Sequence, residues 1–339
     1  MMLFLAGCSS SENTEQGTGN EQTEPQSIEF FAMDTYMTLS VYSDDTEDAE
    51  KVLEEGKALI LDLDEKLSAE KKDSQVAKLN RDRKGSIDED TRCLLEKASY
   101  LYEDTDGVFN IAIYPVMKAW GFTTKKYRVP SKKTLDRLIS RMDLSKLSIS
   151  KDGKSAAIGQ KGMKIDLGGI AKGYASSKVT DLFRENGIES ALVNLGGNVQ
   201  ALGAKPDGSN WRVAIGSPYN EDEYLGVLEI EDKAAVTSGG YERNFTKDGK
   251  TYHHIMDPET GYPADKGLVS VTVVSEDGTL ADGLSTALYI MGREKALDYW
   301  KAHSGQFDAV LMDKNDKLYV TKGLEDSFES DKYDISIVE

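Results

Sequence analysis

The sequence predicts an α+β fold with a mainly antiparallel sheet, built as one large domain. Helical and extended patterns are mixed along the chain, without the regular strand–helix–strand rhythm that a parallel sheet requires. No internal repeat divides the chain. With 339 residues, of which 39% are hydrophobic, the chain is long enough to bury a large core.

The first half of the domain predicts a strand followed by helices. Residues 28–42 alternate and are rich in Phe, Thr, Tyr and Val, which is typical of a strand, with an interruption at residues 33–35. Residues 46–67 place apolar side chains at helical spacing among charged ones, which predicts an amphipathic helix. The further elements expected here are helices at residues 90–104 and 132–141 and a hairpin through residues 152–154.

The second half contains two glycine pairs. An apolar strand runs into Gly168 and Gly169 and then into a helix that ends near residues 186–187. Gly196 and Gly197 lie inside an extended run, where glycine usually marks a bulge or a ligand that approaches the backbone. The remaining expected elements are strands at residues 211–216, 225–230, 234–237 and 268–274, helices at 280–291 and 296–302, and a closing hairpin of 309–313 with 317–321.

The N-terminus resembles that of a bacterial lipoprotein. Leu5-Ala6-Gly7-Cys8 is similar to a lipobox, in which the cysteine receives lipid. The stretch before it lacks the basic residues of a complete signal, which we interpret as a truncated signal, and the alternative is an ordinary hydrophobic N-terminus. Residues 9–27 are almost entirely polar and suit a flexible tether. The expected division is therefore 1–8 lipobox, 9–27 tether and 28–339 domain, anchored through Cys8 to the outer face of the bacterial cytoplasmic membrane.

The charge balance restricts the partners. A formal charge of −18 and a pI near 4.7 argue against nucleic acid or anionic lipid as the main partner, because a polyanion is repelled by most of the surface. An anionic ligand must bind in a pocket prepared with backbone amides, a few cations or a metal ion.

Residues 252–263 carry two of the three histidines of the chain. His254, Asp257 and Thr260 can move protons or bind metal near neutral pH, within a backbone restrained by prolines and a glycine. This pattern favours a rigid functional loop. The alternative is a surface turn whose histidines are incidental.

The turn at residues 166–173 has the components of a phosphate-binding site. It combines glycines, a helix N-terminus with partial positive charge and Lys172. Neither a Walker loop nor a dinucleotide fingerprint is present, so a plain strand-to-helix turn is an equal alternative.

Asp282 and Thr286 are four residues apart and share one helical face. A carboxylate and a hydroxyl in this arrangement suit Mg²⁺, a hard cation that prefers oxygen ligands. The alternative is that Asp282 caps the helix N-terminus while Thr286 packs inward.

A family resemblance joins these motifs. Over residues 28–320 the chain resembles the ApbE family of FAD:protein FMN transferases, whose fold is related to the T-fold. The motifs that carry it are, in order, Met33-Asp34-Thr35, Gly107-Val108-Phe109-Asn110, Trp120-Gly121-Phe122, Asp166 to Tyr174, Gly196-Gly197-Asn198, Ser238 to Arg243, His254 to Gly261 and Asp282 to Thr286.

The resemblance implies an Mg²⁺-dependent enzyme that moves FMN from FAD to a threonine or serine hydroxyl of an acceptor flavoprotein and releases AMP. The acceptor would belong to a membrane redox complex. The residues implied to contact the flavin nucleotide are Met33, Val108, Phe109, Asn110, Asp166 and Lys172, with Arg243 and Ile255 assigned to the same site. The implied metal ligands are the main-chain oxygen of Gly169 and the side chains of Asp282 and Thr286.

His254 matches the motif histidine of the family and is assigned to activating the acceptor hydroxyl, with Asp257 as second candidate for the base or as the group that orients His254. Arg243 could pair with a phosphate or form a structural salt bridge. Two positions depart from the family pattern: Asn110 replaces a usual aspartate, which predicts altered flavin contacts, and Gly283 replaces a common alanine, which predicts a looser helix start.

Three functions remain open at the level of sequence. They are FMN transfer, hydrolysis of FAD to FMN and AMP with water in place of the acceptor, and non-catalytic FAD binding by a lipoprotein. The presence of Asp282, Thr286 and His254 argues against the third.

Overall fold

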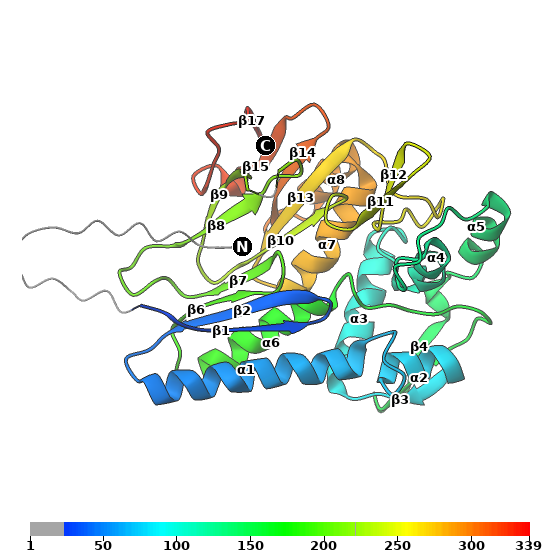
Figure 1. Cartoon of the computed structure of the whole chain (residues 1–339), viewed down its shortest axis with the longest axis horizontal. Coiled ribbons are helices and arrows are strands. Elements are labelled where there is room, and N and C mark those ends of the chain that lie inside the picture. Colours follow the sequence, from blue (N-terminus) through cyan, green and yellow to red (C-terminus); the bar gives the residue numbers. More distant parts are fainter. Residues whose placement is uncertain (1–23, 221) are drawn as a thin grey trace, which may run out of the picture.

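The computed structural model describes residues 24–220 and 222–339, and within them a nine-stranded sheet forms the centre of the molecule (Figure 1). The strand order is β1-β2-β6-β7-β10-β13-β14-β15-β17, and every neighbouring pair is antiparallel except β15 with β17. The α+β prediction with a mainly antiparallel sheet is confirmed. The predicted lipobox with Cys8, and most of the predicted tether, lie outside the described residues.

The strands of the sheet are β1 (Gln26–Ala32), β2 (Thr35–Tyr42), β6 (Ser190–Asn194), β7 (Asn198–Leu202), β10 (Ala234–Gly239), β13 (Leu268–Ser275), β14 (Asp308–Asp313), β15 (Leu318–Thr321) and β17 (Ile335–Val338). The predicted tether boundary at residue 27 is wrong by two residues, because β1 begins at Gln26 and Ser27 pairs with Ser40 on β2. The interruption predicted at residues 33–35 is the turn of the β1–β2 hairpin.

The second glycine pair forms a hairpin turn. Gly196 and Gly197 have φ values of 67° and 93° and connect β6 to β7, which pair antiparallel. The prediction of one extended run is therefore wrong at this point. Both a bulge and a tight turn use the left-handed conformations that glycine adopts most easily, so the residue type did not distinguish them.

Helices α1 (Thr46–Leu67), α6 (Ala171–Glu185) and α7 (Gly278–Met291) cover one face of the sheet, and α3 (Glu89–Asp104) packs against α7 (Figure 1). The main hydrophobic core lies between these helices and the sheet. α7 is buried along almost its whole length, which explains its continuous apolar sequence. Its N-cap is Asp277, which accepts a hydrogen bond from Leu280 N at 2.9 Å, so the alternative that Asp282 caps this helix is wrong.

The other face of the sheet is covered by β8 (Trp211–Gly216), β9 (Tyr224–Ile230) and β16 (Phe328–Glu329), over a smaller hydrophobic core. The short helices and strands between residues 75 and 158 are α2 (Gln75–Asp82), β3 (Lys84–Ser86), α4 (Tyr114–Trp120), α5 (Lys132–Ile139), β4 (Leu147–Ile149) and β5 (Ser155–Ile158). The remaining elements are β11 (Asn244–Lys247), β12 (Lys250–His253), α8 (Arg293–Ala302) and the 3₁₀ turns η1 (Ile111–Ile113), η2 (Leu144–Lys146) and η3 (Lys322–Leu324).

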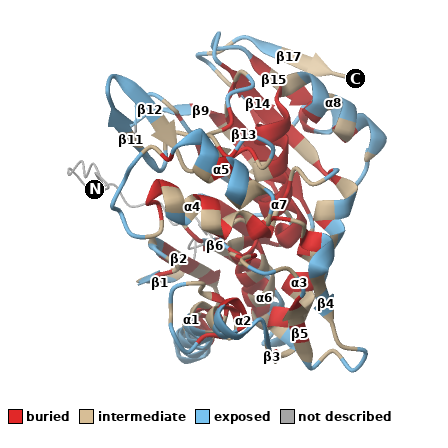
Figure 2. Cartoon of the chain, turned by 90° about the vertical axis from the view of Figure 1, so that its right-hand side faces the viewer, coloured by how far each residue is buried: buried red, intermediate tan, exposed pale blue. Residues whose placement is uncertain are grey.

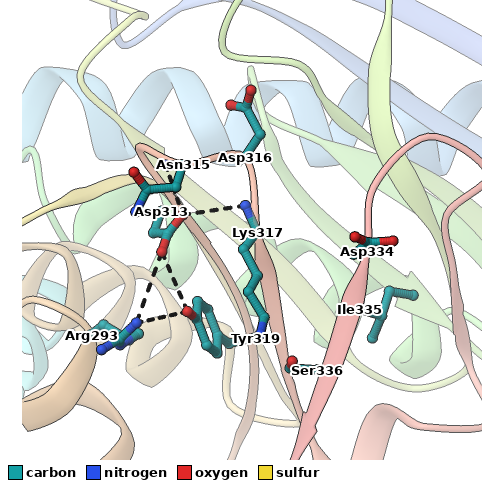
Figure 3. A pocket seen from close by; sticks show the side chains of 9 residues that line it. All are labelled: Arg293, Asp313, Asn315, Asp316, Lys317, Tyr319, Asp334, Ile335 and Ser336. Atoms are coloured by element: carbon teal, nitrogen blue, oxygen red, sulfur yellow. Dashed lines mark hydrogen bonds and ion pairs between the residues drawn. The ribbon is translucent and has the colours of Figure 1, made fainter.

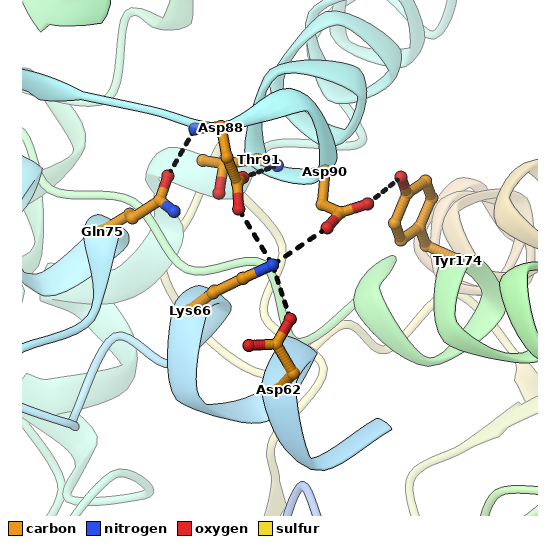
Figure 4. Close-up of polar contacts among 7 residues, drawn as sticks. All are labelled: Asp62, Lys66, Gln75, Asp88, Asp90, Thr91 and Tyr174. Carbon is orange, nitrogen blue, oxygen red and sulfur yellow. Dashed lines mark hydrogen bonds and ion pairs between the residues drawn. The ribbon is translucent and has the colours of Figure 1, made fainter. Parts of the chain in front are cut away.

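A partly exposed ion cluster joins α1, α3 and α6 (Figure 4). Lys66 on α1 lies 2.5 Å from Asp62, 3.1 Å from Asp88 and 3.3 Å from Asp90. Tyr174 on α6 donates to Asp90 at 2.8 Å, and burial together with this carboxylate raises the pKa of its hydroxyl. These contacts link α1, α3 and α6, and the start of α6 belongs to the site described below. Among the described residues no helix is both long and apolar enough to cross a membrane.

Candidate active site

The N-terminal turns of α6 and α7 pack unusually closely. A Cβ on Gly173 would lie 2.1 Å from the carbonyl oxygen of Gly278 and 2.6 Å from Cβ of Asp282, so only glycine fits at this crossing. The N-cap residue of α6, Ile170, provides no side-chain cap. Asp282 supplies one from the neighbouring helix, because its Oδ2 accepts a hydrogen bond from Gly173 N at 2.8 Å.

Asp282 is a buried carboxylate beside a cation. Only 5% of the residue is exposed. Burial raises the pKa of its carboxyl, while the Lys172 charge and the N–H groups of Gly173 and Lys172 act in the opposite direction. A buried carboxylate in this environment favours an additional positive charge nearby.

Thr286 and Gly169 lie close to this carboxylate. A Cβ on Gly169 would be 3.9 Å from Thr286 Oγ1. Ser238 at the end of β10 contacts the same helix, with its Oγ 3.3 Å from Thr286 Oγ1 and 2.8 Å from Ser285 Oγ. The three predicted metal ligands, Gly169, Asp282 and Thr286, are thus brought together.

These oxygen donors fit Mg²⁺ by type. Among the described residues no group of three or more His, Cys, Asp or Glu side chains is placed to hold a metal ion. One carboxylate, one hydroxyl and one main-chain oxygen are hard ligands that leave other positions to water and phosphate oxygens.

Phe109 packs beside the predicted metal ligands. It is buried, and its ring lies 3.6 Å from the Cβ positions of both Gly169 and Gly283. A Cβ on Gly283 would lie 2.4 Å from Cδ1 of Leu101, so this glycine makes room for α3 against α7. Val108, half-buried, packs against the main core next to Phe109.

Asp166 is held in place by backbone contacts. Its N–H donates to Ile111 O at 2.8 Å, and its Oδ1 accepts from Gly168 N at 2.7 Å. Burial raises the pKa of its carboxyl, and the hydrogen bond from Gly168 and the charge of Arg243 oppose this shift. Lys172 makes no ion pair with any carboxylate in the described ranges, so its charge is available in the site.

His254 is oriented by the backbone of Arg243. Its main-chain N donates to Arg243 O at 3.0 Å, and its ring Nδ1 lies 3.2 Å from the same carbonyl oxygen. Since a carbonyl can only accept, Nδ1 carries the proton and Nε2 presents a lone pair. Desolvation and the charge of Arg243 lower the pKa of the imidazole to about 3. His254 is therefore neutral at physiological pH.

Arg243 is a second available cation. Its Nη2 donates to Phe122 O at 3.3 Å, and residues 24–220 and 222–339 contain no carboxylate within ion-pair distance of it. The alternative of a structural salt bridge is wrong for this part of the chain. The phosphate-pairing alternative is compatible with its exposed position.

The side chain of Asp257 contacts its own loop and Lys266. Its Oδ1 accepts from Glu259 N at 2.8 Å and its Oδ2 lies 3.2 Å from Lys266 Nζ. These contacts shape the loop, and the group that orients His254 is the Arg243 carbonyl rather than Asp257. The loop is further fixed by Trp120, whose Nε1 donates to Gly261 O at 2.7 Å.

Two other predicted ligand-contacting residues have buried or hydrogen-bonded side chains. Ile255 is 4% exposed and belongs to the main core. Asn110 Oδ1 accepts from Ala112 N and Nδ2 donates to Met142 O, both at 2.9 Å. An aspartate has no N–H to donate to Met142 O, so this hydrogen bond explains why an asparagine suits position 110.

The sheet contributes two turns to the same region. Met33 and Asp34 both have positive φ in the β1–β2 turn. Thr35 beside them contacts the other turn so closely that a Cβ on Gly196 would be 2.1 Å from its Oγ1. Met33 is half-buried against the core edge, in agreement with a place at the rim of the site.

Glu242 was not predicted as a site residue. Its Oε1 lies 3.9 Å from the Cβ position of Gly197. Burial raises the pKa of its carboxyl, Lys172 and Arg243 lower it, and Asp282 raises it. These charges therefore share one region, and the acidic neighbour of Arg243 in its motif was the available signal.

A separate surface hollow of about 520 Å³ lies over β14, β15 and β17 (Figure 3). Its polar side chains already bind one another: Arg293 Nη1 is 2.7 Å from the Tyr319 hydroxyl, which donates to Asp313 at 3.3 Å. None of the predicted catalytic, flavin or metal residues lines it. The convergence of charged groups, rather than this hollow, marks the candidate active site.

A sequence profile of the ApbE family matches residues 33–311. The chain belongs to the ApbE family. The FAD:protein FMN transferase of Treponema pallidum is 33% identical over 291 residues, covering 81% of this chain and 80% of that protein. The FAD:protein FMN transferase of Klebsiella pneumoniae is 33% identical over 287 residues, covering 84% and 87%.

Solved ApbE structures share the fold. The crystal structure of the ApbE protein from Thermotoga maritima has a TM-score of 0.82 and 29% identity, covering 88% of this chain and 98% of that chain. The apo flavinyl transferase ApbE from Pseudomonas stutzeri has a TM-score of 0.76 and 31% identity, covering 86% and 92%. The family resemblance of the motifs and the ApbE-like fold are confirmed.

Proposed function

We propose that this chain is an FAD:protein FMN transferase, which moves FMN from FAD to a threonine or serine hydroxyl of an acceptor protein and releases AMP. The observation that carries the proposal is the neutral imidazole of His254, with Nε2 free to accept a proton, beside the available cations Lys172 and Arg243. The relatives that bear this name agree with it.

Mg²⁺ suits the oxygens of Gly169, Asp282 and Thr286, and when bound it would supply positive charge to a pyrophosphate. Lys172, Arg243 and the N-terminal turn of α6 offer further positive charge to the same group. This neutralisation allows an oxygen nucleophile to approach phosphorus.

His254 acts on the acceptor in this proposal. Nε2 accepts the proton of the acceptor hydroxyl while the hydroxyl oxygen bonds to the phosphorus of the FMN half. The phosphoanhydride bond to AMP breaks, and AMP takes the bonding electrons. Binding of the anionic pyrophosphate would offset the charges of Arg243 and Lys172, which contribute to the low pKa of His254, and so would strengthen the base when substrate is present.

We further propose that the enzyme works from the outer face of the bacterial cytoplasmic membrane, tethered through lipid on Cys8, on a protein of a membrane redox complex. The lipobox-like residues 5–8 and the polar stretch after them support this location.

Intact mass spectrometry tests the transfer. The purified protein, FAD and Mg²⁺ are incubated with a candidate flavin-carrying domain, and we expect that domain to gain one FMN minus water while AMP accumulates. EDTA should abolish the gain, and His254→Gln should slow it about 10²-fold. Accumulation of FMN and AMP with no mass gain would favour hydrolysis, and intact FAD in all samples would favour a flavin-binding protein.

A further inference from the structure

Basic residues are concentrated in one segment of this acidic chain. Residues 118–141 contain eight Lys or Arg and one Asp, a net charge of +7, whereas the whole chain carries −18, so the remainder carries −25. We define the basic lobe by the exposed side chains Lys118, Lys125, Lys126, Arg128, Lys132, Lys133 and Arg137 on α4, α5 and the loop between them. Only Lys132 has an ion-pair partner within the described ranges, Asp136 at 2.9 Å.

The loop between α4 and α5 in the basic lobe has a closely packed, hydrogen-bonded backbone. Lys125 has a φ of 57°, which a side-chain-bearing residue adopts only rarely. A Cβ on Gly121 would lie 2.0 Å from the carbonyl oxygen of Lys126, and Arg128 N donates to Trp120 O at 3.0 Å. The packed backbone therefore holds Lys125 and Lys126 on the surface, although like charges repel each other there.

The basic lobe adjoins the candidate active site. The carbonyl oxygen of Phe122 accepts a hydrogen bond from the Arg243 side chain, and the ring centroid of Phe122 is 6.4 Å from that of His254. Tyr127 stacks on Phe245 of β11 with centroids 4.8 Å apart and planes at 10°. Figures 1 and 2 both place α4, α5 and the β11–β12 hairpin at the same end of the molecule.

We propose that the basic lobe is the docking surface for an acidic face of the acceptor protein. The inference rests on the proposed function, since it concerns the second substrate of that reaction. The lobe lies outside Lys172 and Arg243, the two cations to which the FAD phosphates are assigned, so its charge serves another partner. An acidic acceptor is repelled by most of this enzyme and attracted only beside His254, which orients the encounter.

Charge reversal tests this docking. Lys125→Glu combined with Lys126→Glu should lower kcat/KM for the acceptor about 10-fold at low salt, and the difference should shrink as salt screens the charges. The KM for FAD should stay unchanged. Lys295→Glu combined with Lys301→Glu on α8 is the matched control, because it reverses two exposed lysines outside the lobe. The probe is a flavin-carrying domain onto which the wild-type enzyme transfers FMN.

A second substitution in the acceptor completes the test. Replacing the acidic side chains around its modified hydroxyl by amides should lower kcat/KM with wild-type enzyme and have little further effect with the charge-reversed enzyme. If the double reversal does not fold, Lys133→Glu with Arg137→Glu on the exposed face of α5 replaces it.

The outcomes separate the two proposals. Absence of transfer by the wild-type enzyme to any acceptor would overturn the proposed function. Normal transfer by wild type with an unchanged kcat/KM in the reversed enzyme would overturn the docking surface alone. Loss of binding to phosphatidylglycerol vesicles with unchanged acceptor kinetics would assign the lobe to lipid instead and also overturn it.

Discussion

The two halves of the candidate active site are built in different ways. Gly169 and Lys172 lie at the start of α6, and Asp282 and Thr286 lie on α7. The close approach of the two helices at Gly173 and the hydrogen bond to Asp282 belong to the fold itself. Arg243 and His254 lie on the segment around β11 and β12, which is held by single carbonyl contacts and aromatic stacking.

This difference separates two tasks. In the helical half the carboxylate that is proposed to bind Mg²⁺ also caps a helix, so function and stability would depend on the same atoms. In the loop half the imidazole of His254 supports little besides its own orientation. Substitutions in the first half should therefore affect activity and folding together, and those in the second half mainly activity.

The largest effect is expected for Asp282→Asn. The amide keeps an oxygen for Gly173 N–H but loses the negative charge that suits Mg²⁺, so kcat should fall about 10³-fold, at the upper end for loss of one preorganised electrostatic group. Mg²⁺ titration of activity and thermal unfolding check this.

Asp282→Ala is the companion variant. It removes the cap as well, and should cost roughly 1 kcal/mol of stability beyond the amide variant. Equal melting temperatures for the two variants would contradict the dual role of this carboxylate.

The next effect is expected for His254→Gln in the loop half. The variant removes the proton acceptor while the Arg243 carbonyl can still receive a side-chain N–H, so transfer should fall about 10²-fold. The affinity for FAD and the melting temperature at pH 7.5 should change little, as measured by flavin fluorescence and calorimetry. A loss of stability as large as that of Asp282→Ala would remove the distinction between the halves.

Local patterns predicted the long elements well. The helical spacing of apolar side chains predicts a helix at 46–67, which are its observed bounds, and the structure adds Asp45 as its N-cap. The role of Asp282 needed tertiary structure: spacing puts it on one face with Thr286, but the helix end that it caps belongs to α6, 109 residues away in sequence.

The loop around His254 shows why a motif predicts a site better than each role within it. Ile255 and Asp257 are near His254 in sequence, yet Ile255 enters the core and Asp257 binds Glu259 N and Lys266. Neighbouring residues of an extended or turning backbone point in different directions, so closeness in sequence does not imply a shared pocket. The carbonyl that orients His254 has no side-chain signature at all.

The smallest expected effect is on how the stability of the folded protein depends on pH, and it again tests the loop half of the site. The folded protein lowers the pKa of His254 from 6.5 to about 3, chiefly by desolvation. Between these values the unfolded chain binds the proton and the folded chain does not, so stability from the neutral ring is fully present above pH 6.5 and is lost as the pH falls toward 3. The glutamine of His254→Gln does not titrate, so this variant does not lose that stability as the pH falls. Its melting temperature relative to wild type should therefore rise steadily from pH 7 to pH 4.5, and a constant difference would show that His254 is not desolvated in the folded protein.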